Sequence, residues 1–212
     1  MRAGILLSAA LALIPSMLRA ECDSRAFIDA NRNGVFDQGE RGLSGVGVSD
    51  GEHIVRSDSD GRYRLAAAPG KTLFIIKPAG YALPLRSDGL PDFFANQTGS
   101  AQGLKYGGVP RSDTGCKSFA LHPVVQPENS PLSVLVFGDP QPKSAVDIDY
   151  YLRDIITPLR GNPAATLGIS LGDIVHDDLT LLPEVKKADS QLGIPRLYAA
   201  GNHDIDFDAA GD

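Results

Sequence analysis

Three short polar segments follow apolar runs in the C-terminal part of the chain, and their residue types suit divalent metal ions. Residues 138–141 read Gly-Asp-Pro-Gln, residues 172–177 read Gly-Asp-Ile-Val-His-Asp, and residues 201–204 read Gly-Asn-His-Asp. Carboxylates, amides and an imidazole on neighbouring loops can hold two divalent cations, which bind a phosphoryl oxygen and activate a water. Each motif alone is common in loops, but three in order predict a dinuclear site for phosphate esters.

The apolar runs before these motifs predict strands at residues 132–137, 166–171 and 195–200. Between them, residues 145–159 have helical spacing and residues 181–192 are compatible with a helix. Strands that alternate with helices indicate a parallel α/β sheet, whose carboxyl ends gather ligands at one edge. The continuous apolar character of the first run predicts a strand that is buried on both faces.

The preceding part of the chain has the pattern of a small β-sandwich. Asp50-Gly51 and Asp60-Gly61 suit tight turns, because aspartate and glycine tolerate positive φ angles. Residues 80–115 are rich in Gly, Pro, Asp and Ser and predict a long irregular excursion. The expected strand runs are residues 26–28, 46–48, 54–56, 63–65, 73–76 and 118–121.

A second candidate metal site lies at residues 29–40, which match the calcium-loop pattern D-x-[DN]-x-[DN]-G-x5-E. Its flanks are strand-like and turn-like, so we expect an EF-hand-like loop within a β-domain. The alternative is an Asx-rich surface loop whose side chains cap their own backbone. The expected ligands are the side chains of Asp29, Asn31, Asn33, Asp37 and Glu40 and the backbone carbonyl of Val35.

Residues 132–212 resemble the first part of the calcineurin-like metallophosphoesterases, through the family blocks D-x-H, G-D-x-x-x-D and G-N-H-D. The resemblance implies hydrolysis of phosphate esters through two divalent cations, which are Mn, Mg, Fe or Zn. It also implies that Asp139 binds the first metal, Asp173 bridges both and Asn202 binds the second. Gln141 stands where the family has histidine, and an amide oxygen there favours the harder ions manganese and magnesium.

The same resemblance assigns acid–base roles to the third motif. His203 contacts the phosphate and protonates the leaving oxygen, and Asp204 orients its ring. His176 is expected to be an ordinary polar residue rather than a ligand. The family's later histidine and its Gly-His-x-His block do not occur after His203, so we expect a site that is incomplete at the C-terminus and a fragment that is inactive alone.

The region from Asp29 to Tyr63 resembles the SdrD B-like and carboxypeptidase regulatory-like β-domains of exported bacterial proteins, which are non-catalytic spacers. Residues 1–20 read as a signal peptide, which predicts a secreted or periplasmic bacterial protein without a membrane anchor after cleavage. In that compartment Cys22 and Cys116 would form a disulfide, and the alternative is two unpaired thiols.

The sequence therefore predicts a signal peptide at 1–20, a β-sandwich domain at 21–124, a linker at 125–131 and a partial α/β phosphoesterase domain at 132–212. The net charge of −6 argues against a nucleic-acid partner. The expected partners are a phosphate-ester substrate and a C-terminal continuation of the same protein. The alternative function is a non-catalytic exported module, whose calcium-stabilised β-domain binds a partner.

Overall fold

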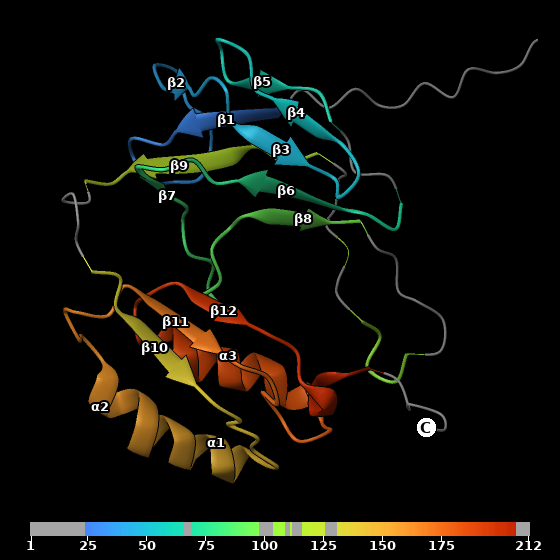
Figure 1. Ribbon diagram of the computed structural model, residues 1–212, viewed down its shortest axis with the longest axis vertical. Helices are drawn as coiled ribbons and strands as arrows, with labels where there is room; N and C mark the ends of the chain where they lie inside the picture. The colour runs from blue at the N-terminus through green and yellow to red at the C-terminus, as the bar shows by residue number, and fades with distance from the viewer. Residues whose placement is uncertain are drawn as a thin grey trace, which may run out of the picture.

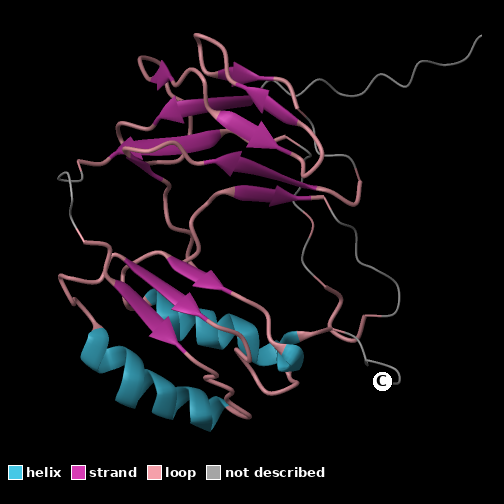
Figure 2. Ribbon diagram, viewed as in Figure 1, coloured by secondary structure: helices cyan, strands magenta, loops and turns pink. Residues whose placement is uncertain are grey.

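A computed structural model describes residues 24–65, 69–97, 104–108, 111, 116–125 and 131–206. Most of the regular structure is β-sheet, and the few helices occur after residue 144 (Figures 1 and 2). Within the described residues, no helix is long and apolar enough to cross a membrane. The expected signal peptide at 1–20 and Cys22 lie outside the described residues.

The first part of the chain forms two sheets. The first has the order β2-β1-β9-β7, with β5 paired to β1, and the second has the order β4-β3-β6-β8. The strands of the first sheet are β1 (Ser24–Ile28), β2 (Arg41–Gly42), β5 (Arg62–Tyr63), β7 (Tyr81–Ala82) and β9 (Phe119–Pro123). Those of the second are β3 (Gly47–Ser49), β4 (Ile54–Arg56), β6 (Thr72–Ile76) and β8 (Phe94–Asn96).

One hydrophobic core joins these two sheets. Phe119 and Leu121 from β9 and Val48 and Leu73 from the second sheet are fully buried and belong to the same cluster. Burial alternates along β6, as a sheet with one buried face requires, whereas all three residues of β3 are buried. Five of the six expected strand runs are confirmed, as β1, β3, β4, β6 and β9, and the sixth, at residues 63–65, overlaps β5 only at Tyr63. Strands β7 and β8 fall in the region that was expected to be irregular.

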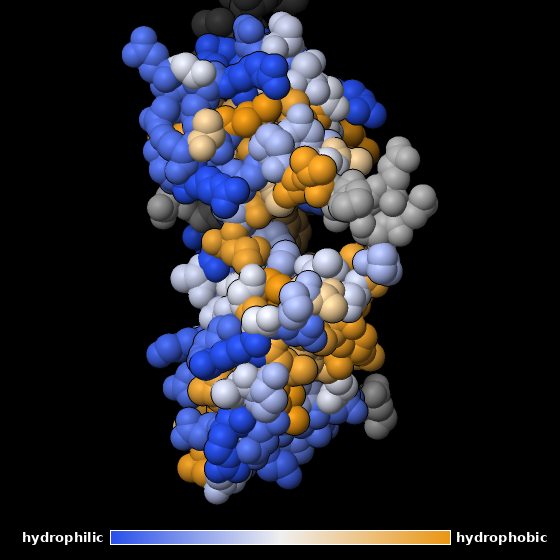
Figure 3. All heavy atoms as spheres, turned by 90° about the vertical axis from the view of Figure 1, so that its left-hand side faces the viewer, coloured by the Kyte–Doolittle hydropathy of each residue, from blue (hydrophilic) through white to orange (hydrophobic). Residues whose placement is uncertain are grey.

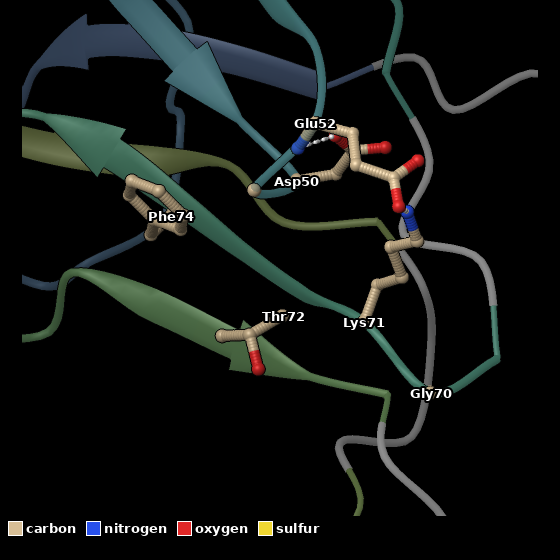
Figure 4. Close-up of a pocket in the computed structure, with 7 residues that line it drawn as sticks. Asp50, Glu52, Gly70, Lys71, Thr72 and Phe74 are labelled. Carbon is tan, nitrogen blue, oxygen red and sulfur yellow. Dashed lines mark hydrogen bonds and ion pairs between the residues drawn. The ribbon is translucent and has the colours of Figure 1, made fainter.

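The turn between β3 and β4 is the tight turn expected at Asp50-Gly51. Gly51 has φ +93°, and the Asp50 carboxylate accepts bonds from the backbone N–H groups of Glu52 and His53. The bond from His53 is the main reason that the pKa of Asp50 falls to about 2. Figure 4 shows the shallow pocket beside this turn, where Lys71 pairs with Glu52. The pocket is lined by Asp50, Gly51, Glu52, Gly70, Lys71, Thr72 and Phe74.

The last part of the chain forms a three-stranded parallel sheet of order β10-β11-β12 with helices between the strands. Its strands are β10 (Val134–Phe137), β11 (Leu167–Ser170) and β12 (Arg196–Tyr198). Its helical segments are α1 (Ala145–Tyr151), η1 (Leu152–Ile156), α2 (Thr157–Leu159), η2 (Leu179–Leu181), α3 (Leu182–Ser190) and η3 (Asn202–Asp204). The expected βαβαβ order is confirmed.

The stretch from α1 to α2 is helical throughout but contains a π-helical turn. The Ser144 hydroxyl caps its start by accepting a bond from the N–H of Asp147. The π turn of η1 ends just before Pro158, which lacks the N–H that a regular helix needs at this point. The Thr157 hydroxyl donates to the carbonyl of Leu152 and satisfies one of the displaced acceptors.

Strand β10 was expected to be buried on both faces, and this expectation is wrong. Phe137 is buried beneath the helices, but Val136 on the opposite face is 60% exposed. Leu197, in the same row of the sheet but two strands away on β12, is 41% exposed. The helices α1 and α3 pack against each other on one face of the sheet. Both lie on the same side because the strands follow one another across the sheet in chain order and each crossover between them is right-handed. Figure 3 shows hydrophobic side chains among hydrophilic ones on the visible surface.

A buried ion pair lies between this sheet and α3. The Arg196 Nη2 donates to Asp189 Oδ2 at 2.9 Å, and both residues are fully buried. Tyr151 and Tyr198 each donate a hydroxyl hydrogen bond of 2.8 Å to the same carboxylate. Burial raises the pKa of Asp189. Gly168 leaves room for the arginine, since a Cβ there would lie 2.7 Å from its Cδ.

Candidate metal centre

The three polar motifs begin where the parallel strands end, at one edge of the sheet (Figure 1). Strand pairing continues just past β10 and β11, with Leu171 N–H donating to the Phe137 carbonyl and Ala199 N–H to the Ser170 carbonyl. The loops that follow the strands are therefore neighbours in space, as the sequence predicted from parallel topology.

Asp173 connects all three loops through its own hydrogen bonds. Its Oδ2 accepts a bond of 3.0 Å from Gln141 Nε2, and its backbone carbonyl accepts a bond of 3.0 Å from the Gln141 N–H. Its Oδ1 accepts a bond of 3.2 Å from the N–H of His203. A carboxylate between two other polar loops is the arrangement that a ligand shared by two cations needs.

The backbone around this point is unusual. Asp139, Gln141, Asp173 and Asp177 have φ values of 42°, 41°, 46° and 62°, in the left-handed region that residues with a Cβ rarely adopt. Such residues cost free energy and gather at functional sites, where the surrounding structure holds them. Their concentration on two of the three loops supports a built site rather than ordinary turns.

Two glycines allow the loops to approach each other. A Cβ on Gly201 would lie 2.1 Å from Asp173 Oδ1 and 2.3 Å from the Asp173 backbone nitrogen. Gly172 has φ +114°, and a Cβ there would lie 3.1 Å from Gly201. The close approach of the two loops therefore explains why glycine precedes Asp173 in the second motif and Asn202 in the third.

Asp204 has a different role from the one expected. It was expected to orient the ring of His203, but its carboxylate accepts bonds from the N–H groups of Gly201, Ile174 and Val175 at 2.8 to 3.0 Å. It therefore ties the second loop to the third. The turn that forms η3 places its side chain back toward the start of its own motif, where its oxygens accept these backbone bonds.

Asp177 makes the contact with the ring of His203. The His203 Nδ1 lies 2.7 Å from Asp177 Oδ1, and this hydrogen bond raises the pKa of His203 and lowers the pKa of Asp177. The final aspartate of the second motif is therefore the partner that sequence reasoning missed. Its position four residues after Asp173 in the G-D-x-x-x-D block was the available signal.

The remaining expected ligands, Asp139 and Asn202, lie at the solvent-exposed side of the loops. Among the described residues, neither side chain has a hydrogen-bond partner. Gln141 uses its amide nitrogen toward Asp173, which leaves its oxygen available. Carboxylate and amide oxygens on adjacent strand ends match the preference of manganese and magnesium, so the residues present fit the implied metals.

His176 lies closer to this centre than the sequence indicated. Its ring stacks on that of His203 with centroids 4.6 Å apart, and its Nε2 lies 3.8 Å from Asp177 Oδ2. One potential ligand atom from each of these three residues lies within 4.8 Å of the others, a spacing that suits a metal ion. The Nδ1 atom of His176 is buried and has no hydrogen-bond partner among the described residues.

A segment of the excursion before β9 also reaches the centre. The Tyr106 hydroxyl donates to the carbonyl of Asp177 at 2.9 Å, and the N–H groups of Tyr106 and Gly108 donate to the carboxylate of Asp206. This contact could not be predicted from the sequence, because the excursion lacks periodicity. Residues more than 70 positions apart in the chain meet here.

The loop at residues 29–40 closes on itself around its carboxylates. Asp29 is buried and accepts bonds from the N–H groups of Asn33 and Gly34, and Gly34 has φ +77°. Glu40 accepts bonds from the N–H groups of Ala30 and Asp37. The side chains of Asn31 and Asn33 both donate to Asp37 Oδ2. The expected side chains therefore converge, although the bonds that they make are also those of the alternative Asx-rich loop.

Cys116 is disulfide-bonded, and the chain contains two cysteines. Its expected partner, Cys22, lies outside the described residues. The alternative of two unpaired thiols is therefore wrong for Cys116.

Comparison with known protein families finds a match for the β-rich part of the chain. Residues 30–106 match the family described as N terminal of calcineurin-like phosphoesterase. The resemblance to calcineurin-like phosphoesterases is thus confirmed, and it is confirmed by the region before the three metal-type motifs. The expected likeness of this region to SdrD B-like and carboxypeptidase regulatory-like domains is not supported. No curated protein matches the chain.

Proposed function

We propose that this protein is an exported metal-dependent phosphoesterase, whose dinuclear centre is built on residues 139–204. The observation that carries the proposal is the meeting of Gln141, Asp173 and the His203 backbone at adjacent strand ends. The match of residues 30–106 to the N-terminal region of calcineurin-like phosphoesterases supports the same reaction class.

In this proposal each residue has a separate task. Asp139 and Gln141 would hold one cation, Asn202 would hold the other and Asp173 would bind both. The cations, when bound, polarise the phosphate ester and supply an activated water. Asp204 keeps the loops of Asp173 and His203 in register through its three backbone hydrogen bonds.

His203 would donate a proton to the leaving oxygen of the substrate. Its Nδ1 is held by the Asp177 carboxylate, so its Nε2 is the atom from which the proton leaves. The negative charge of Asp177 favours the protonated ring and fixes its orientation. Asp177 is therefore the residue that positions the His203 ring in this reaction, whereas Asp204 acts on the backbone of the loops.

We further propose a two-domain organisation for the exported protein. The β-rich residues 21–124 would form one domain, residues 125–131 the linker and residues 132–212 the first part of the catalytic domain. A continuation of the same protein beyond residue 212 would add further ligands. The disulfide at Cys116 suits the secreted or periplasmic environment that the N-terminal sequence predicts.

The experiment is hydrolysis of a chromogenic phosphomonoester and a phosphodiester in the presence of manganese. It compares this chain with the protein expressed from its whole reading frame. We expect turnover by the longer protein and a loss of at least about a thousand-fold in Asp173→Asn, because a ligand shared by both metals contributes several kcal/mol to catalysis.

The matched control is Asp154→Asn, which changes an exposed aspartate on η1 that pairs with Arg153. It should retain the activity of the parent protein. If the longer protein is inactive with every metal and both esters, or if Asp173→Asn is as active as the control, the phosphoesterase proposal is wrong.

We also propose that the loop at residues 29–40 binds calcium and stabilises the β-rich part. The support is that the side chains of Asp29, Asn31, Asn33, Asp37 and Glu40 converge, as shown by their shared hydrogen bonds. Calcium would replace the mutual bonds of these oxygens with coordination, while Gly34 keeps the positive φ that the sharp turn requires.

Thermal unfolding with calcium and with a chelator tests this proposal. Calcium at about one hundred times its dissociation constant should add roughly 2.7 kcal/mol to the free energy of unfolding, and Glu40→Gln should remove most of the gain. Asp58→Asn is the control, since Asp58 makes similar bonds to the N–H groups of Asp60 and Arg62 outside the loop. An equal shift in all three proteins, or none, would show an ordinary Asx-rich loop.

A further inference from the structure

We propose that His176, Asp177 and His203 form a separate site for a single zinc-type ion, and that occupation of this site inhibits the enzyme. The proposed inhibition rests on the proposed function, whereas the proposed zinc binding does not. The site shares no residue with the oxygen-rich set at Asp139, Gln141, Asp173 and Asn202.

The geometry of the three side chains is already close to that of a metal site. Each offers one ligand atom within 4.8 Å of the other two, and the imidazole rings lie 4.6 Å apart at an angle of 23°. The Asp177 carboxylate lies within reach of both rings, with its Oδ1 2.7 Å from His203 Nδ1 and its Oδ2 3.8 Å from His176 Nε2. Small side-chain rotations would direct all three atoms at one point.

The position of Asp177 is imposed by the fold rather than by this ion pair alone. Its φ of 62° is in the left-handed region, and its carbonyl is held by the Tyr106 hydroxyl. The Nδ1 atom of His176 is buried and has no hydrogen-bond partner among the described residues. No hydrogen bond at this atom therefore has to break when the ring turns toward an ion. Its side chain is 34% exposed and that of His203 is 26% exposed, which leaves an ion a path from solvent.

The ligand types select a different metal from that of the proposed catalytic centre. Two imidazoles and one carboxylate are a common set for zinc, with a water in the fourth position. Amide and carboxylate oxygens alone suit manganese and magnesium. The chain thus presents a nitrogen-rich site directly beside an oxygen-rich one.

Inhibition follows from the shared use of His203. A histidine nitrogen that binds zinc is neutral, and the proton that it carried is released to solvent. With zinc at Nδ1 the ring would keep only its Nε2–H, which in a neutral imidazole is a far weaker acid than in an imidazolium. Asp177 would also turn from the Nδ1 atom, which it holds at 2.7 Å, toward the ion, so the ring would lose the contact that positions it. The catalytic metals would remain bound, so the effect would be on turnover rather than on their occupancy.

Zinc binding is measured in a protein whose oxygen-rich centre has been removed by Asp139→Asn and Asp173→Asn. Zinc is titrated in competition with a chromogenic chelator, and the same titration is made after adding His176→Gln. We expect one zinc ion per chain in the first protein. We expect a loss of affinity of at least about 10- to 100-fold in the second, the range that even outer-shell partners of a metal produce.

His53→Gln is the matched control, because His53 lies at the exposed turn between β3 and β4 and should not change the affinity. Zinc should also shift the NMR signals of the His176 and His203 rings together. Equal affinity with and without His176, or zinc binding that requires Asp173, would overturn the inference. Because this readout needs no catalysis, a failure of the phosphoesterase assay would leave it unaffected.

Discussion

Gly201→Ala should abolish metal binding at the strand-end centre without removing a single ligand. The added Cβ would lie 2.1 Å from Asp173 Oδ1 and 2.3 Å from the Asp173 backbone nitrogen, distances that no stable packing tolerates. The loop of Asp173 must therefore move, and its bonds to Gln141 and to the N–H of His203 must break. We expect a loss of manganese affinity and of turnover comparable with that of Asp173→Asn.

The matched control for this change is Gly138→Ala. Gly138 precedes Asp139 in the first motif as Gly201 precedes Asn202 in the third, but a Cβ on Gly138 would meet no atom within 4 Å. Its variant should retain the parent manganese affinity and melting temperature. If Gly201→Ala binds manganese as well as Gly138→Ala does, the close approach of the two loops is not what builds the centre.

The second large effect is expected on stability. Arg196→Met leaves the Asp189 carboxylate buried without its cation, and breaking a buried ion pair in this way costs about 3–5 kcal/mol of the free energy of unfolding. Methionine keeps much of the side-chain volume, so the cost measures the charge and hydrogen bonds rather than a cavity. The contact of the guanidinium with the Phe137 ring, 4.0 Å from its centroid, is lost as well.

Urea denaturation of Arg196→Met and of Arg153→Met measures this difference. Arg153 also pairs with an aspartate at 2.7 Å, but its side chain is 66% exposed, so solvent screens the pair and little stability should be lost. Similar losses in the two variants would contradict a special role for burial. Recovery in the double variant Arg196→Met with Asp189→Leu would show that the stranded carboxylate causes the loss.

Much of the fold was predictable because its signals are local. Apolar runs and turn residues located β1, β3, β4, β6 and β9 and the strands of the parallel sheet. The convergence of the three motifs followed from parallel topology, which places all carboxyl ends at one edge. The short strands β7 and β8 were missed, because they pair with partners distant in the chain and have no alternation of their own.

The roles of individual side chains were harder to predict. The choice of Asp177 rather than Asp204 as the partner of His203 depends on the turn of η3 and on a positive φ at Asp177. The contact of Tyr106 with the same loop joins segments 71 residues apart. The exposed face at Val136 depends on which side of the sheet the helices occupy, and the apolar run alone does not contain this information.

The most direct test of the metal centre is manganese binding by the protein expressed from its whole reading frame, followed by electron paramagnetic resonance. The account predicts two ions per chain with the spectrum of a coupled pair, and loss of that coupled spectrum in Asp173→Asn, with Asp154→Asn unchanged. A protein that binds no manganese, or whose two ions stay coupled without the Asp173 carboxylate, would contradict the claim that Asp173 joins the loops into a dinuclear site.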